Sequence, residues 1–322
     1  MKTDLISAVR IILEKCIVLK ANERCLVLTD ATAERKEIAE LLYEDAKKTT
    51  SKAELLKIPE PTMNGEEPST TLADKMKGFD VILIITAKSL SHTKARKNAC
   101  EAGARIASMP GITKDIMLRA IDVDYDKMKE RTNKIADALD KAETVRVVTE
   151  IGTDITFSIK DRLAHGRKTG IYDQAGYWGN LPEGEAFIAP VEGTAKGVYV
   201  VDASQAGIGK LKKPITIRVK EGFAVEFEGG DEAIKLKQIL ERIHDKNAFN
   251  IAELGIGTNI RAVVTGVTLE DEKVFGTCHF ALGNNAGFGG NINVPVHLDG
   301  VLNKPTIYLD EIIIMEKGEL LI

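Results

Sequence analysis

Apolar positions in the first part of the chain alternate between helical and strand-like spacing. Between Asp4 and Leu19, the residues Leu5, Val9 and Cys16 recur at the spacing of one helix face. Short apolar runs follow, separated by polar helical stretches, and the run from Asp80 to Ile85 is apolar throughout its body, as in strands buried on both faces. This alternation predicts a parallel sheet covered by helices.

The expected elements of this region are bounded by changes of period and by Gly, Pro and Asn. The predicted helices span Asp4–Leu19, Ala31–Lys48, Thr71–Gly78, Thr93–Gly103 and Asp124–Lys141. The predicted strands span Arg24–Thr29, Lys52–Ile58, Asp80–Ile85 and Arg105–Ser108. No GxGxxG sequence or P-loop occurs at a strand-to-helix turn, so nothing here supports nucleotide binding.

The pattern changes near residue 145, where β-branched residues and glycines begin to dominate. The predicted strands span Val145–Glu150, Asp154–Lys160, Gly197–Val201, Ile215–Lys220, Ala224–Glu228, Lys304–Leu309 and Glu311–Met315, with one helix at Glu232–Arg242. We therefore expect two domains. Residues 1–144 form an α/β domain with a parallel sheet, and residues 145–322 form a β-rich α+β domain.

Composition and charge exclude several classes of protein. The chain has 322 residues, 44% of them hydrophobic, which suits two globular domains. With 44 basic and 48 acidic residues and no basic stripe, nucleic acid is not an expected partner. The longest apolar runs fall far short of the ~20 residues of a membrane span. Residues Met1 to Asp4 lead into an amphipathic pattern rather than a signal peptide, and the four cysteines are scattered, so we expect a cytoplasmic protein with reduced thiols.

Candidate chemistry is concentrated in four glycine-containing pieces of the C-terminal part, although GxSxG and HExxH are missing. The pair His297 and Asp299 would lie on one face of a strand, about 6.5–7 Å apart, a gap that a metal ion can bridge. His279 lies on another apolar strand, and Glu185 and Glu253 lie in glycine-rich stretches. Together these residues form a plausible carboxylate- and imidazole-rich site. A nucleophilic Cys278 beside His279 is less favoured, because neighbours on a strand point to opposite faces.

The order of these pieces resembles the thermophilic aminopeptidase T family of two-metal exopeptidases. The resemblance runs through the sequences Gly-Thr-Asp-Ile-Thr at residues 152–156, Asn-Leu-Pro-Glu-Gly-Glu-Ala-Phe at 180–187 and Phe-Glu-Gly-Gly at 227–230, and then through the Glu253, His279 and His297 motifs. It covers roughly residues 145–322. No single motif is diagnostic, but their order and spacing together are fairly specific.

The resemblance implies roles for individual residues. The metal ligands of the family correspond to Glu185, Glu253, His279, His297 and Asp299. Its acidic residue before the first histidine has its nearest counterpart in Glu272, a candidate general acid/base. The C-terminal domain is then the catalytic metal-binding domain. One departure stands out, since the tyrosine ligand of the family is replaced here by Ala286.

The implied function is a metallo-aminopeptidase that removes the N-terminal residue of short peptides. Two divalent ions, zinc, cobalt or manganese, would activate a bridging water. Similar family members are dimers, so a homodimer is expected.

Two alternatives remain open. His279, His297 and Asp299 also form the set of two histidines and one carboxylate that holds Fe(II) in non-haem oxygenases, and some proteins similar to this peptidase family are iron-dependent dioxygenases that open a dihydroxypyridine ring. The loss of the tyrosine ligand favours this alternative, whereas Glu185 and Glu253 favour two metals. The third possibility is a binding protein without metal chemistry.

Overall fold

The computed structural model describes residues 4–30 and 32–322 and divides into two compact units. The first unit contains Met1–Tyr125 and Gly170–Glu183, and the second contains Asp126–Thr169 and Gly184–Ile322. The start of the chain from Met1 to Thr3, on which the expected absence of a signal peptide partly rests, lies outside the described residues. The expected division into folding domains at residue 144 stays a prediction.

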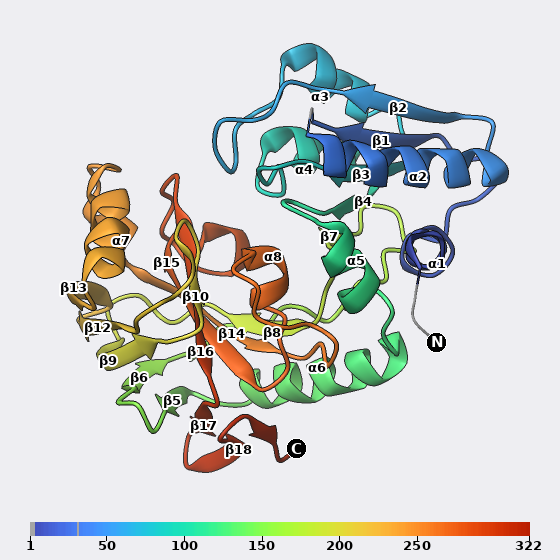
Figure 1. Cartoon of the computed structure of the whole chain (residues 1–322). Helices are drawn as coiled ribbons and strands as arrows, with labels where there is room; N and C mark the ends of the chain where they lie inside the picture. Colours follow the sequence, from blue (N-terminus) through green and yellow to red (C-terminus); the bar gives the residue numbers. More distant parts are fainter. Residues whose placement is uncertain (1–3, 31) are drawn as a thin grey trace. The chain divides into compact units, whose positions relative to one another are not determined.

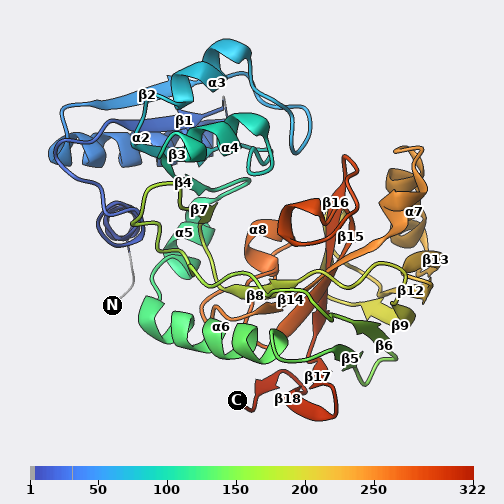
Figure 2. The same ribbon diagram turned by 180° about the vertical axis from the view of Figure 1, so that it is seen from behind.

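The first unit is built on a parallel sheet with the strand order β2-β1-β3-β4-β7. Its strands are β1 Cys25–Thr29, β2 Ala53–Lys57, β3 Val81–Ile85, β4 Arg105–Ser108 and β7 Trp178–Asn180. Its helices are α1 Leu5–Arg10 with the π-helical turn η1 Ile11–Cys16, α2 Ala33–Thr49, α3 Thr70–Met76, α4 Lys94–Glu101 and α5 Lys114–Ala120. Helix α2 covers one face of the sheet, and α3 and α4 cover the other (Figures 1 and 2).

The predicted α/β region is confirmed, since each predicted strand and helix has its counterpart within a few residues. Ala31, the first residue of one predicted helix, lies outside the described residues. Helix α5 and strand β7 of this unit were not predicted, and β7 comes from far along the chain. Its sequence Trp-Gly-Asn has no apolar run, and only its parallel pairing with β4 makes it a strand.

A buried ion pair stabilises the first unit. The guanidinium of Arg105 donates to both carboxylate oxygens of Glu23, at 2.9 and 2.7 Å. We expect Glu23→Gln to lower the free energy of unfolding by about 2 kcal/mol, because a buried guanidinium then lacks its counter-charge. Urea denaturation measures this change. The control Glu40→Gln, which removes an exposed pair with Lys36, should cost less than ~0.5 kcal/mol, and equal costs would contradict the prediction.

The second unit consists of two antiparallel sheets. Their orders are β11-β10-β16-β15-β14-β8 and β13-β12-β9-β6-β5-β17-β18-β19. The first sheet contains β8 Glu185–Ile188, β10 Ser204–Gln205, β11 Gly209–Lys210, β14 Ile251–Gly257, β15 Thr277–Gly283 and β16 His297–Asn303. The second contains β5 Thr144–Val148, β6 Asp154–Ser158, β9 Lys196–Val201, β12 Ile215–Lys220, β13 Phe223–Glu228, β17 Thr306–Leu309, β18 Ile312–Glu316 and β19 Glu319–Leu320.

One hydrophobic core joins the two sheets of this unit. Phe280 and Leu254 from one sheet lie in the same buried cluster as Phe157 and Ile217 from the other. The helical segments are α6 Tyr125–Leu139, α7 Asp231–Glu241, α8 Thr268–Asp271 and the 3-10 turns η2 Lys246–Phe249 and η3 Ala286–Phe288. The predicted β-rich region is thereby confirmed as an antiparallel one.

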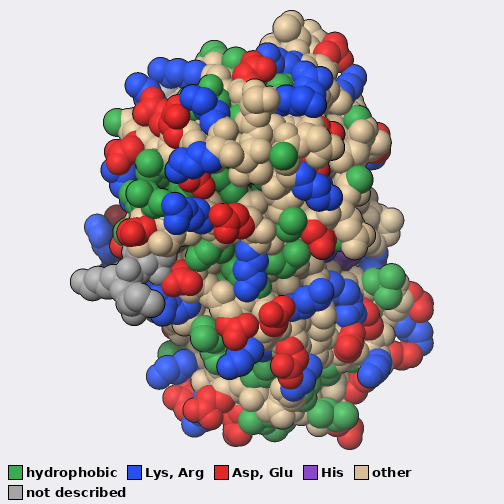
Figure 3. Space-filling model, turned by 90° about the vertical axis from the view of Figure 1, so that its right-hand side faces the viewer, with side chains coloured by type: hydrophobic (Ala, Val, Ile, Leu, Met, Phe, Trp, Pro, Cys, Tyr) green, Lys and Arg blue, Asp and Glu red, His purple; other side chains and the backbone are tan. Residues whose placement is uncertain are grey.

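Surface and cysteine features agree with the expectations from composition. Basic and acidic side chains are interspersed on the face that Figure 3 shows. Within residues 4–30 and 32–322, no helix is both long and apolar enough to cross a membrane. The cysteines Cys16, Cys25, Cys100 and Cys278 are buried and form no disulfide bond, as expected of reduced thiols.

Candidate metal centre

The two faces of strands β14, β15 and β16 have opposite character. Successive side chains of a strand point to opposite faces. Leu254 and Phe280 point into the hydrophobic core, and Cys278 lies there too, as predicted. Their neighbours Glu253 and His279 therefore point to the other face. A β-bulge between Ile251 and Glu253 brings Glu253 opposite Ala281.

Small residues make room for the large polar ones on this face. Ala281 is paired with Glu253 on one side and with Asp299 on the other. Gly255 is paired with His279. A Cβ added at Gly255 would lie only 2.1 Å from Cε1 and Nε2 of the His279 ring. The imidazole therefore occupies the space that a side chain at position 255 would need.

Two histidines and three carboxylates converge on this face. His279 Nε2 lies 3.3 Å from Glu253 Oε1 and 3.4 Å from Glu185 Oε2. His297 Nε2 lies 3.4 Å from Glu253 Oε2 and 3.3 Å from Asp299 Oδ1. Glu253 thus bridges the two imidazoles through its two oxygens.

All six site residues predicted from the sequence lie within three overlapping groups. In each group, one donor atom per residue lies within 4.8 Å of the others. The first group is Glu185, Glu253 and His279, the second is Glu253, His297 and Asp299, and the third is Glu272, His279 and Asp299. Their role as ligands stays a prediction.

His297 is better oriented for ligation than His279. The Nδ1 of His297 lies 2.8 Å from the carbonyl oxygen of Asn284. A proton on Nδ1 donated to that oxygen leaves the Nε2 lone pair free for a cation. The Nδ1 of the fully buried His279 has no hydrogen-bond partner among the described residues, and neither has Glu185 Oε2.

Burial and mutual charge shift the pKa values of this cluster. Burial favours neutral His279, but the hydrogen bond to Glu253 and the charges of Glu185 and Asp299 outweigh it and raise the pKa of His279 to about 9. Burial would raise the pKa of Glu253, but its hydrogen bonds to His279 and His297 hold it far below the ordinary value. Burial is also the main cause that raises the pKa of Glu272 to about 8. The carboxylates Glu253 and Asp299 and the imidazoles therefore stabilise each other's charged forms in this site.

Lys273 is a residue of this site that the sequence analysis missed. Its ammonium lies 2.5 Å from Glu185 Oε1 and 2.6 Å from Glu272 Oε1, and the side chain is only 1% exposed. The position follows helix α8, where Asp271 accepts the backbone N–H groups of Thr265 and Gly266 and so folds the preceding loop. In the sequence, only its place directly after Glu272 could have drawn attention to it.

Ala286, which stands where a tyrosine ligand was expected, begins turn η3 and offers no ligand atom. Two residues later, the ring of Phe288 lies edge-on to His297, with 5.9 Å between the ring centroids. Phe187 on β8 lies 5.5 Å from Phe288. Instead of the expected tyrosine ligand, this part of the site has phenylalanine rings, which offer no ligand atom.

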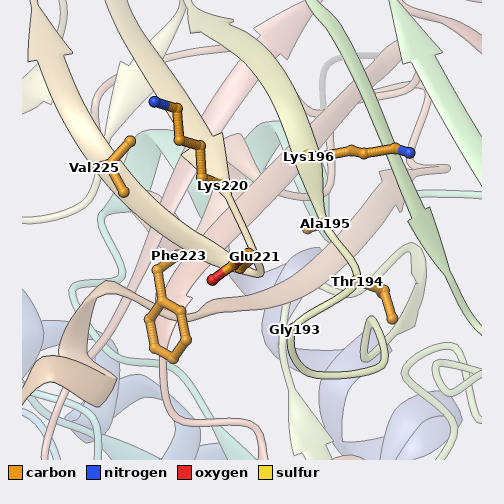
Figure 4. Close-up of a pocket in the computed structure, with 8 residues that line it drawn as sticks. All are labelled: Gly193, Thr194, Ala195, Lys196, Lys220, Glu221, Phe223 and Val225. Atoms are coloured by element: carbon orange, nitrogen blue, oxygen red, sulfur yellow. The ribbon is translucent and has the colours of Figure 1, made fainter.

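The donor set fits a divalent transition metal ion. Imidazole and carboxylate together suit zinc, manganese or ferrous iron rather than calcium or a thiolate-bound metal. The crowded carboxylates, and Glu185 Oε2, which is buried without a hydrogen bond, also fit a site completed by a cation. An open pocket of the same unit, between the loop Gly193–Lys196 and the hairpin Lys220–Val225, has no such set, and its two lysines extend in opposite directions (Figure 4).

Comparisons with known proteins show which family model matches the chain and which solved structures have a similar fold. The family model described as 2,5-dihydroxypyridine 5,6-dioxygenase (NicX) matches residues 4–322. A 2,5-dihydroxypyridine 5,6-dioxygenase from Pseudomonas putida KT2440 is 25% identical over 249 residues, covering 74% of this chain and 70% of the relative. A solved structure of the 2,5-dihydroxypyridine dioxygenase of that organism has a TM-score of 0.83 at 21% identity, covering 99% of this chain and 98% of the other.

The solved structure of wild-type AmpT from Thermus thermophilus is also similar, with a TM-score of 0.71 at 17% identity and 99% of each chain covered. This likeness shows a shared fold and explains why motifs in the same order indicated the peptidase. The expected membership in the aminopeptidase T family is nevertheless wrong, and so are the hydrolase function and the short-peptide substrate that followed from it. Because the family model spans residues 4–322, the chain belongs to the 2,5-dihydroxypyridine 5,6-dioxygenase (NicX) family.

Proposed function

We propose that this chain is a metal-dependent dioxygenase that opens the ring of a dihydroxypyridine. The observation that carries the proposal is the match of the dioxygenase family model to residues 4–322. The histidines and carboxylates of the site support it, because imidazole is a ligand that suits iron, and the group Glu253, His297 and Asp299 places an imidazole beside two carboxylates.

The proposed ligands are Glu253, His297 and Asp299, with His279 beside them. His297 is the strongest candidate, since the Asn284 carbonyl oxygen orients its ring. When bound, ferrous iron supplies the redox chemistry that dioxygen needs to react with an aromatic ring.

The remaining residues bind, orient or move protons. The ring of Phe288 lies next to His297, and the ring of Phe187 lies against Phe288. These rings offer apolar edges and faces to a flat aromatic substrate. Glu272 stays the candidate general acid/base, because its buried carboxyl lies beside His279 and Asp299 and can exchange a proton with a substrate hydroxyl group.

Oxygen uptake tests the proposed function. Protein loaded with Fe(II) should consume one O₂ for each 2,5-dihydroxypyridine opened, followed by an oxygen electrode and by loss of the absorbance of the ring. Removal of iron with a chelator should abolish the reaction, and Fe(II) should restore it. Boiled protein with free Fe(II) is the control. Hydrolysis of aminoacyl substrates without oxygen uptake would contradict the proposal.

The expected homodimer also stays a prediction, which light scattering can test.

A further inference from the structure

The loop between β15 and β16 supplies two of the contacts of His297. The carbonyl oxygen of Asn284 lies 2.8 Å from His297 Nδ1, and the ring of Phe288 lies edge-on to the imidazole. Residues 283–294 include four glycines and four asparagines and have few apolar side chains to bury. Because ordering glycine is costly in conformational entropy, hydrogen bonds have to contribute much of the order of this loop.

Glu192, in the loop between β8 and β9, holds the β15–β16 loop on both sides of turn η3. Its Oε1 accepts a side-chain N–H of Asn285 at 2.9 Å, before the turn, and the backbone N–H of Asn291 at 2.7 Å, after it. Its Oε2 accepts a guanidinium N–H of Arg162, which follows β6. One carboxylate thus joins three loops of the second unit.

Asn285 carries this contact into the backbone of the loop. Its side chain is fully buried, and its Oδ1 accepts the backbone N–H of Ile292 at 2.8 Å. Its own backbone N–H donates to the carbonyl oxygen of Ile292 at 3.0 Å. That N–H and the carbonyl of Asn284 belong to one planar peptide. The contacts of Asn285 therefore fix the direction of the carbonyl that faces His297.

The charge of Glu192 strengthens these contacts. Burial would raise its pKa, but the N–H groups of Asn291 and Asn285 and the charge of Arg162 outweigh burial and hold the pKa below its ordinary value. Hydrogen bonds to an ionised carboxylate are roughly twice as strong as those between neutral groups. Glu192 belongs to none of the three candidate metal groups, so its carboxylate is left to the loop.

We propose that Glu192 is a positioning residue of the metal centre, which acts through the Asn284–Asn285 peptide to keep Nε2 of His297 directed at the metal. The inference rests on the proposed function in one respect, that His297 binds a metal. It adds a residue that orients a ligand from outside the ligand set.

Titration of the metal-free full chain with Co(II), followed by visible absorption, tests the proposal. Glu192→Ala should bind Co(II) about 10- to 100-fold more weakly than the wild type, as is typical when a group that orients a metal-bound histidine is lost. The control Glu232→Ala removes a carboxylate that accepts the backbone N–H groups of Lys212 and Lys213 in another loop of the same unit. It should bind Co(II) within about twofold of the wild type.

A proton NMR signal separates positioning from a general loss of stability. In the Co(II) form, the exchangeable proton on Nδ1 of a metal-bound histidine is shifted out of the main spectrum. A hydrogen bond to the Asn284 oxygen slows its exchange with water, so the wild type should show the signal of His297. Folded Glu192→Ala should lose it through faster exchange, and circular dichroism checks the fold. Glu232→Ala should keep it.

The outcomes separate this inference from the proposed function. Wild-type affinity in folded Glu192→Ala, or a weaker affinity with the His297 signal unchanged, would overturn the role of Glu192 and leave the oxygen-uptake test untouched. No Co(II) binding by the wild type would overturn the metal centre and this inference with it.

Glu192→Gln decides the matter if the alanine variant does not fold. Glutamine keeps the volume and one accepting oxygen but loses the charge that strengthens the contacts with Arg162 and the loop. This variant should bind Co(II) about threefold or more weakly than the wild type. An affinity within about twofold of the wild type, with the His297 signal unchanged, would overturn the proposal.

Discussion

Replacing His297 by alanine should remove the metal and lower ring-opening activity by at least about 100-fold. The imidazole is the one histidine of the site whose second nitrogen is held by a backbone carbonyl, at 2.8 Å from Asn284 O. Metal content by elemental analysis and oxygen uptake measure the two effects.

The control is His244→Asn, at an exposed position with a φ of 55°, a conformation that asparagine tolerates. It should keep both metal and activity. Circular dichroism should show that His297→Ala retains the fold, since the side chain is 25% exposed and outside the hydrophobic core. A folded His297→Ala protein with full metal content would contradict the assignment of this residue as a ligand.

Gly255→Ala should damage the centre without changing any polar group. The new Cβ would lie 2.1 Å from the His279 ring, which the pairing of β14 with β15 holds directly opposite. The ring must turn away or the strands must separate, so we expect a loss of about 1–3 kcal/mol in the free energy of unfolding. Displacement of His279 from Glu253 should also lower activity, by roughly 100-fold for a misplacement of about 1 Å. Urea denaturation and oxygen uptake measure these changes.

Gly287→Ala is the matched control, because a Cβ at Gly287 would meet no atom within 4 Å. This variant should keep its stability to within about 0.5 kcal/mol and its activity. If Gly255→Ala behaved like Gly287→Ala, the close packing of His279 on β14 would not be needed for the centre.

Much of the fold followed from local patterns. The run Asp80–Ile85 indicated a strand buried on both faces, and β3 is buried throughout at Val81–Ile85. Helix α7 and strand β12 also lie where the periodicity placed them. Strand β7 was missed, because a three-residue segment without apolar alternation becomes a strand only through a partner that lies more than seventy positions earlier, at Ile106–Ser108.

The candidate site was predictable as a set of residue types but not as an arrangement. His279, His297 and Asp299 attracted attention because histidine and aspartate on apolar strands are unusual. Their grouping depends on the register of β14, β15 and β16, in which Ala281 separates Glu253 from Asp299. The predicted peptidase was wrong because motif order follows the fold, and the fold is shared with AmpT at 17% identity.

The local sequence alone was enough to predict the periodic elements, the α/β and β-rich regions, and the carboxylates and imidazoles available to a metal site. This is because the period of the side chains and the chemistry of the residues are properties of neighbouring positions. Tertiary structure alone decided which oxygens face which nitrogens, and that a lysine lies among them. Lys273 reaches Glu185 across 88 positions of sequence, and a charge pair of that kind exists only after the strands have paired. Whether a carboxylate meets a metal or an ammonium is therefore settled by the packing of the sheet, and no local pattern in the chain records it.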